Sequence, residues 1–199
     1  ETSTEGCSVA LGDGLSQLAS VFEIAPRQHT RLLPFMMNEV LAKSGIRRTD
    51  INYVAYGNGP GAFTGVRIAA ATAQGIAMGL NIPMIPISTL AILAQTGFDF
   101  YDLYAARVAI DARKGEIYWA DYQLNSNSLA SLQGEEKLTK IEYLDSMELK
   151  PANGFGSGWH LLSVSLDDNE IVIDPELLPN ASSMLKLAAQ AIVENKVFP

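Results

Sequence analysis

The most constraining feature of this sequence is a glycine-rich loop at residues 57–65 that leads into a run of small residues. The loop reads Gly-Asn-Gly-Pro-Gly-Ala-Phe-Thr-Gly. Glycine permits positive φ and close backbone approach, and proline stiffens the turn. A helix that starts here presents free N–H groups, so the loop suits either an anion or a closely packed neighbour. No lysine follows the last glycine, so this is not a Walker A loop, and it is not a clean dinucleotide fingerprint.

The residues that follow, 66–80, predict a helix with little side-chain bulk. Each interior glycine costs a helix about 1 kcal/mol relative to alanine. That cost is understandable if another backbone must come close, either within the chain's own domain or from another subunit. The small residues are Ala69, Ala70, Ala71, Ala73, Gly75, Ala77 and Gly79.

Composition describes an acidic globular protein. The chain has 199 residues, of which 48% are hydrophobic and 18% charged, and no apolar run is long enough to cross a bilayer. The net charge of −8 makes it a poor tRNA binder on its own, since such binding relies on Lys and Arg at phosphates. Cys7 is the single cysteine and lies in an apolar run, which indicates a buried, inert thiol and a cytoplasmic protein.

Hydrophobic periodicity predicts an α/β fold with a mixed sheet flanked by helices. A turn at 12–14 joins the first two expected strands. The polar residues 125–134 are expected to form a loop or boundary. The expected strands are 7–11, 18–25, 51–56, 83–87, 108–111 and 116–123, and the expected helices are 31–44, 66–80, one from 88 to 96, and 184–194.

Six short segments of the sequence together resemble the bacterial TsaB (YeaZ) family, and they occur in the family's order. They are residues 2–10, 26–30, 57–68, 73–77, 86–90 and 110–119, with weaker likeness at 154–159 and 178–179. The resemblance implies an actin-like ATPase (ribonuclease H-like) fold of two lobes. We expect an N-terminal lobe at 1–104 and a smaller C-terminal lobe at 105–199.

The resemblance also implies a function. Members of this family are non-catalytic scaffold subunits of the machinery that makes threonylcarbamoyladenosine on tRNA, beside the anticodon. The TsaD (Kae1-type) subunit carries the transfer chemistry, and the ATPase TsaE is recruited. We therefore expect TsaD, TsaE and a second copy of this chain as partners, contact with tRNA only through the complex, and no contact with membranes.

A metal site or a protease site is not expected. TsaD carries a His-x-x-x-His motif, and Thr89 and Leu93 occupy the matching positions here. Leucine cannot ligate a metal, and the only histidines, His29 and His160, are far apart in the sequence. Neither histidine lies in a motif that would serve a nucleophile, so we expect neither metalloprotease nor other protease activity.

A nucleotide site is expected to be degenerate. Thr2, Ser3 and Thr4 resemble the phosphate turn of actin-like ATPases, and Gly59 and Gly61 belong to the glycine-rich loop. Asp111 has two readings: it either serves a phosphate loop or pairs with Arg113 and caps local backbone N–H groups. The run 154–158 either approaches an adenine or forms a tight turn. We expect no cofactor and at most weak ATP or ADP binding; the alternative function is an actin-like ATPase or small-molecule kinase with its own nucleotide site.

A helical stripe at 31–44 is the candidate partner interface. Spacing alone favours a core-facing helix in a monomer. The stripe with its flanking Phe35 and Leu32 is wider than one face needs, however, and the next helix carries unusually small residues. The resemblance implies that two helices pair with two from another subunit. Arg27, His29 and Arg67 flank these helices, where they either rim the interface or are solvated or local helix-cap partners. The expected interface residues are Leu33, Met36, Met37, Val40, Leu41, Arg67, Ala70, Ala73 and Ala77.

Overall fold

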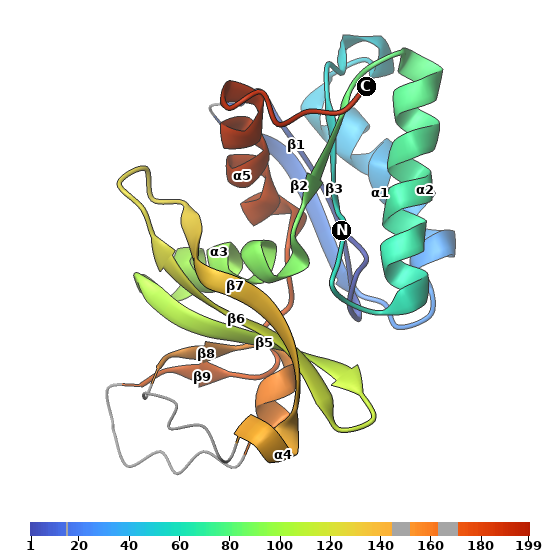
Figure 1. Cartoon of the computed structure of the whole chain (residues 1–199). Helices are drawn as coiled ribbons and strands as arrows, with labels where there is room; N and C mark the ends of the chain where they lie inside the picture. The colour runs from blue at the N-terminus through green and yellow to red at the C-terminus, as the bar shows by residue number, and fades with distance from the viewer. Residues whose placement is uncertain (15, 145–151, 163–170) are drawn as a thin grey trace. The chain divides into compact units, whose positions relative to one another are not determined.

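A computed structural model describes residues 1–14, 16–144, 152–162 and 171–199. The chain forms two compact units (Figure 1). Unit 1 consists of Glu1–Ile92 together with Pro179–Pro199, and unit 2 consists of Leu93–Leu178.

Unit 1 contains two pairs of strands. The hairpin of β1 (Gly6–Gly12) and β2 (Gln17–Ile24) is antiparallel, as the sequence predicted. Its turn is stabilised by the Asp13 carboxylate, which accepts a hydrogen bond from the Ser16 N–H at 2.8 Å. The second pair, β3 (Val54–Gly57) and β4 (Met84–Ile87), is parallel.

Three helices flank these strands in unit 1. Helix α1 (His29–Ser44) ends at Gly45, and α2 (Phe63–Leu80) ends at Asn81; both terminating residues adopt the left-handed conformation that stops a helix. Helix α5 (Ala181–Val193) begins at Asn180, whose side chain accepts a hydrogen bond from the Ser182 N–H. A single 3-10 turn, Arg48–Asp50, precedes β3.

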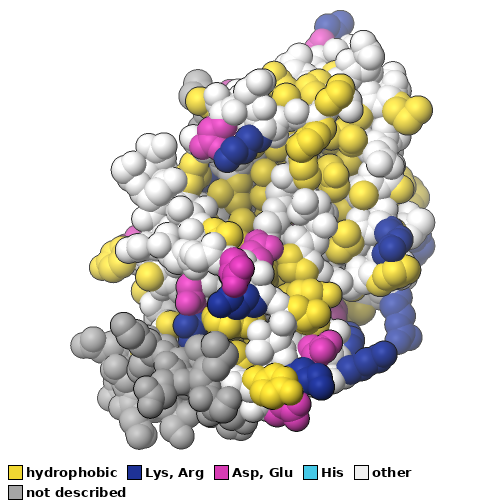
Figure 2. Space-filling view, viewed as in Figure 1, with side chains coloured by type: hydrophobic (Ala, Val, Ile, Leu, Met, Phe, Trp, Pro, Cys, Tyr) yellow, Lys and Arg dark blue, Asp and Glu magenta, His cyan; other side chains and the backbone are white. Residues whose placement is uncertain are grey.

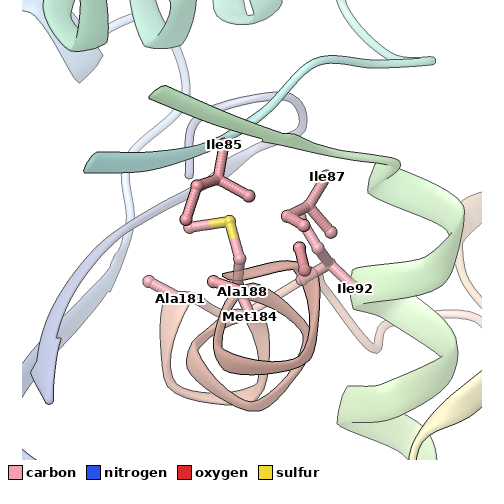
Figure 3. Packing of buried hydrophobic residues seen from close by; sticks show 7 residues of the cluster. Ile85, Ile87, Ile92, Ala181, Met184 and Ala188 are labelled. Carbon is pink, nitrogen blue, oxygen red and sulfur yellow. The ribbon is translucent and has the colours of Figure 1, made fainter. Parts of the chain in front are cut away.

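Helix α5 packs against β4, which places the end of the chain in unit 1. Figure 3 shows Met184 reaching from α5 toward Ile85 on β4. The buried cluster consists of Ile85, Ile87, Ile92, Ala181, Met184, Ala188 and Ala191. The expected division between residues 104 and 105 assigned this helix to the C-terminal lobe, and the structure differs because the apolar stripe of α5 covers the sheet of unit 1.

Unit 2 is built on a five-stranded sheet with the order β7-β6-β5-β8-β9. The first three strands are antiparallel, and β8 and β9 run parallel to β5. The strands are β5 (Ala105–Arg113), β6 (Glu116–Leu124), β7 (Ala130–Lys140), β8 (Gly154–Phe155) and β9 (Ile173–Asp174). The expected loop at 125–134 is too long, because β7 begins at Ala130; as an edge strand, it is mostly exposed and polar.

Two tryptophans organise one core of unit 2. Trp119 and Trp159 pack with Ala109, Ile117 and Leu144. The indole N–H of Trp159 donates to the Arg107 carbonyl at 3.1 Å, which satisfies its buried polar atom. Among the described residues of this unit, the helical parts are most of α3 (Thr89–Tyr101), the short α4 (Ile141–Leu144) and the 3-10 segment Ser157–Leu161.

Candidate functional site

The glycine-rich loop packs directly on the turn formed by residues 2–4. A Cβ atom on Gly61 would overlap the Ser3 carbonyl, and one on Gly65 would overlap the Thr2 carbonyl. The Ala62 N–H donates to that Ser3 carbonyl at 2.8 Å. These glycines are therefore required by close approach of the chain's own backbone.

Two of the three hydroxyl groups in the expected phosphate turn are engaged by the chain itself. Thr2 donates its hydroxyl to the Gly65 carbonyl at 2.8 Å, and the Thr4 hydroxyl accepts from the Gly6 N–H at 3.4 Å. Of these three hydroxyl side chains, only Ser3 has no hydrogen-bond partner in the structure. The structure brings Gly61 onto Ser3 as a packed contact, whereas Gly59 lies beside Val66 and its carbonyl accepts the Thr89 N–H.

Asp111 lies in unit 2 and is engaged locally. Its carboxylate accepts a hydrogen bond from the Arg113 N–H at 2.7 Å and forms an ion pair with the Arg113 side chain at 3.4 Å. Its own N–H donates to the Ser157 hydroxyl at 3.1 Å. Of the two readings of Asp111, the structure shows the local one, in which it holds the β5–β6 turn.

The glycines at 154–158 serve tight packing as well. A Cβ atom on Gly154 would overlap the Trp159 ring, and one on Gly158 would come too close to Ala109. The segment is neither an open loop nor a simple turn: it comprises strand β8 and the start of the 3-10 segment Ser157–Leu161, and its glycines allow both to pack on β5.

Thr89 and Leu93, the positions that the sequence analysis matched to a His-x-x-x-His motif, are fully buried in α3. The Thr89 N–H donates to the Gly59 carbonyl at 2.8 Å, and its hydroxyl has no partner in the structure. Across the described ranges, no group of three or more His, Cys, Asp or Glu side chains is placed to hold a metal ion.

Five of the expected interface residues face the core. Leu33, Met36 and Val40 point inward from α1, where Leu33 and Met36 pack with Cys7 and Ala25. Ala73 and Ala77 point inward from α2. These assignments need correction, because a side chain covered by its own unit cannot contact a partner. A periodic stripe shows which residues share a face, but it does not show what covers that face.

Other expected interface residues are at least partly accessible. Met37, Leu41 and Ala70 are half-buried, and Arg67 is exposed. His29, expected at the rim, is buried instead, with its Nε2 atom 3.2 Å from the Gly6 carbonyl oxygen.

The exposed side of the helix pair carries large apolar residues. Phe35, Phe63 and Met78 have 69%, 72% and 84% of their surface exposed. Phe35 had been noted beside the core stripe, whereas Phe63 and Met78 were missed. The signal that could have revealed them is an apolar residue out of phase with the buried stripe. We define the outer face of α1 and α2 as Phe35, Phe63, Arg67, Ala71, Gly75, Met78 and Gly79.

Charge is divided unevenly between the two units. Unit 1 contains eight Lys and Arg and seven Asp and Glu, whereas unit 2 contains six Lys and Arg and fifteen Asp and Glu. The excess of negative charge therefore belongs to unit 2.

On the side of unit 1 seen in Figure 2, hydrophobic side chains gather between α5 and α2. Among the described residues, no helix is both long and apolar enough to span a membrane.

Comparison with known proteins decides the family. A family model described as "TsaD: tRNA N6-adenosine threonylcarbamoyltransferase" matches residues 21–154. The tRNA threonylcarbamoyladenosine biosynthesis protein TsaB of Escherichia coli is 41% identical, over 98% of this chain and 87% of that protein. The chain belongs to the TsaB family. The TsaB protein of Haemophilus influenzae is 36% identical, over 94% of this chain and 82% of its own length.

A solved TsaB-family structure confirms the fold. YeaZ from Pseudomonas aeruginosa superposes with a TM-score of 0.84 at 37% identity, covering 98% of this chain and 91% of that one. The fold is therefore actin-like (ribonuclease H-like), as the sequence predicted.

Proposed function

We propose that this TsaB-family chain is a non-catalytic subunit in the biosynthesis of threonylcarbamoyladenosine on tRNA. In this role it holds a TsaD-type transferase in an active arrangement and supports recruitment of a TsaE-type ATPase. The names of its relatives support the pathway. The observation that carries the scaffold role is the outer face of α1 and α2.

Two glycines of α2, Gly75 and Gly79, are not explained by the chain's own packing. A Cβ atom added to Gly75 or Gly79 would meet nothing within 4 Å. Each glycine inside a helix nevertheless costs about 1 kcal/mol relative to alanine. Ala71, Gly75 and Gly79 are spaced four residues apart and so lie on one face of the helix. We infer that a partner helix approaches α2 closely along this line.

The exposed large residues fit the same proposal. Phe63 and Met78 lie near opposite ends of α2, and Phe35 projects from the neighbouring α1. Aromatic residues and methionine are enriched in the centres of protein interfaces. Arg67 adds a cationic group beside Phe63, which suits the edge of such a contact. A second copy of the chain and a TsaD-type subunit would use the same face, so one would exclude the other.

The non-catalytic part of the proposal rests on how the candidate catalytic groups are used. The loop glycines contact Thr2 and Ser3, and Asp111 holds its own hairpin. We therefore propose no resident cofactor and at most weak ATP or ADP binding. Contact with tRNA would pass through the complex, because unit 2 is strongly acidic. The buried thiol of Cys7 suits the cytoplasm that we propose as its location.

The test compares two exposed apolar residues changed to glutamate. Met78→Glu places a charge on the outer face, and Val193→Glu, at a site 80% exposed on α5, is the matched control. We would measure mass by light scattering for the protein alone and mixed with a TsaD-type subunit. A desolvated, unpaired charge is costly in an interface. Association should therefore be lost in Met78→Glu and kept in Val193→Glu. Unchanged association of a folded Met78→Glu protein would refute the interface.

The actin-like fold leaves one alternative, an ATPase or kinase with its own nucleotide site. Turnover of ATP by the purified chain, abolished by Asp111→Ala, would favour that alternative. Absence of turnover together with loss of association in Met78→Glu would favour the scaffold.

A further inference from the structure

Strand β4 has one side paired and one side facing away from β3. The Asn58 N–H donates to the Ile87 carbonyl at 3.0 Å, and the Val54 N–H donates to the Pro83 carbonyl at 3.2 Å. Backbone groups of a strand alternate in direction, so residues 83, 85 and 87 point toward β3. Met84 and Pro86 therefore direct their backbone groups to the outer edge of β4.

The end of the chain covers that outer edge at Met84. The Met84 N–H donates to the Phe198 carbonyl at 2.7 Å, and the Phe198 N–H donates to the Met84 carbonyl at 2.9 Å. This is an antiparallel pair joined by two hydrogen bonds. Pro86, the next residue that faces outward, has no N–H to offer. Within β4, the one outward N–H is thus already bonded, and the other position has none.

The segment that carries Phe198 is anchored to α5. The Asn195 N–H donates to the Ile192 carbonyl at 3.0 Å, and the Lys196 N–H donates to the Ala191 carbonyl at 2.8 Å. Asn195 adopts a left-handed conformation with φ 57°, which turns the chain back after the helix. Val197 then packs against the cluster that contains Ile85 and Ile87. The segment 195–198 is therefore held at both its start and its pairing point.

We propose that Phe198 and Pro86 together guard the edge of β4 against strand pairing with a second copy of this chain. Open strand edges are templates for such pairing, and proteins protect them with prolines or covering segments. The residues of β4 are Met-Ile-Pro-Ile, which lack the charged side chains that protect other edges. The edge is protected instead in two ways. The backbone of Phe198 occupies the hydrogen-bonding groups of Met84, and Pro86 has no N–H with which a second strand could pair.

Amide hydrogen exchange tests whether the segment is engaged. Phe198→Pro removes the N–H that bonds Met84, whereas the matched control Phe198→Ala keeps that N–H and removes only a half-exposed ring. We expect exchange of the Met84 amide to rise about tenfold in Phe198→Pro and to stay within about twofold in Phe198→Ala. Equally fast exchange of this amide in the wild-type protein would refute the proposal.

Self-association of variants tests whether an unprotected β4 edge pairs with a second copy of the chain. The variants are made with Met78→Glu, so that contacts through the outer face of α1 and α2 do not contribute. Pro86→Val restores an outward N–H, and Phe198→Pro loosens the covering segment. The double change should give a mass by light scattering that rises with protein concentration, and neither single change should rise as far. A folded double variant that stays monomeric while its Met84 amide exchanges rapidly would overturn the guarding role.

Discussion

The guanidinium carbon of Arg67 lies 3.3 Å from the centroid of the Phe63 ring, one helical turn away on α2. The same guanidinium donates a hydrogen bond to the Phe63 carbonyl at 3.1 Å. An exposed aromatic ring is thus held in one orientation before any partner arrives. Such preorganisation lowers the ordering cost of binding.

This pair should matter more for association than for folding. Phe63→Ala removes a ring that is mostly exposed, so the free energy of unfolding should change by no more than about 1 kcal/mol. Association through the outer face of α1 and α2 should weaken more than tenfold if Phe63 is an anchor of the interface. Urea unfolding and light-scattering titration measure the two effects. A loss of stability as large as the loss of association would contradict this assignment.

Two helix glycines should respond in opposite ways to alanine. Gly75→Ala should raise the free energy of unfolding by up to about 1 kcal/mol, because the new Cβ meets nothing and helix propensity improves. Gly97→Ala should lower it, because its Cβ would overlap the Phe155 ring in unit 2. Chemical denaturation of both variants checks the signs. Destabilisation by Gly75→Ala would mean that this position has an internal role.

The ion pair between Arg107 and Asp121 should contribute measurably to the free energy of unfolding. The Arg107 side chain is only 10% exposed and donates two hydrogen bonds to the Asp121 carboxylate, at 2.8 and 3.0 Å. Asp121→Ala leaves a mostly buried cation unpaired and should cost about 2 kcal/mol, below the range for fully buried pairs because Asp121 is partly exposed. Asp111→Ala removes an ion pair with exposed Arg113 and the hydrogen bond from the Arg113 N–H, and should cost no more than about 1 kcal/mol. Denaturant unfolding measures both changes. Equal losses in the free energy of unfolding for Asp121→Ala and Asp111→Ala would contradict this prediction.

Cys7 should make stability fall at alkaline pH. Burial raises the pKa of its thiol in the folded protein. Once the pH passes the ordinary pKa of a thiol, the unfolded chain ionises there while the folded one does not. Stability from the neutral thiol is therefore complete at neutral and acidic pH and declines as the pH rises toward the folded pKa. The free energy of unfolding of wild type and of Cys7→Ala can be measured from about pH 7 to about pH 10.5, a range that includes the ordinary thiol pKa of about 8.5. It should decline more steeply with pH in the wild type.

Local sequence signals predicted most elements but not their neighbours. Gly45 marked the end of α1, and the turn at 12–14 marked the first hairpin, because both depend on nearby residues. The start of β7 at Ala130 was missed, since an exposed edge strand carries the polar residues of a loop. The position of α5 in unit 1 was missed for a different reason. Its stripe of Met184, Ala188 and Ala191 predicts burial but does not identify β4 as the surface it covers.

The candidate surface was predicted only in part. The sequence identified α1 and α2 as the helices of interest, but it selected the stripe that packs inward, as Met36 shows. The informative residues were those that packing inside the chain could not explain, such as Met78 and Gly75. Recognising them requires knowing which side of each helix the sheet covers, and that information comes from residues distant in sequence.

The division of unit 1 between the two ends of the chain has a consequence for synthesis. Translation runs from the N-terminus, so all of Leu93–Leu178 is made after β4 and before α5. Until α5 emerges from the ribosome, Ile85 and Ile87 lack the helix that covers them in the finished protein. Unit 2 can therefore complete its contacts first, and unit 1 is the last part of the nascent chain to finish folding.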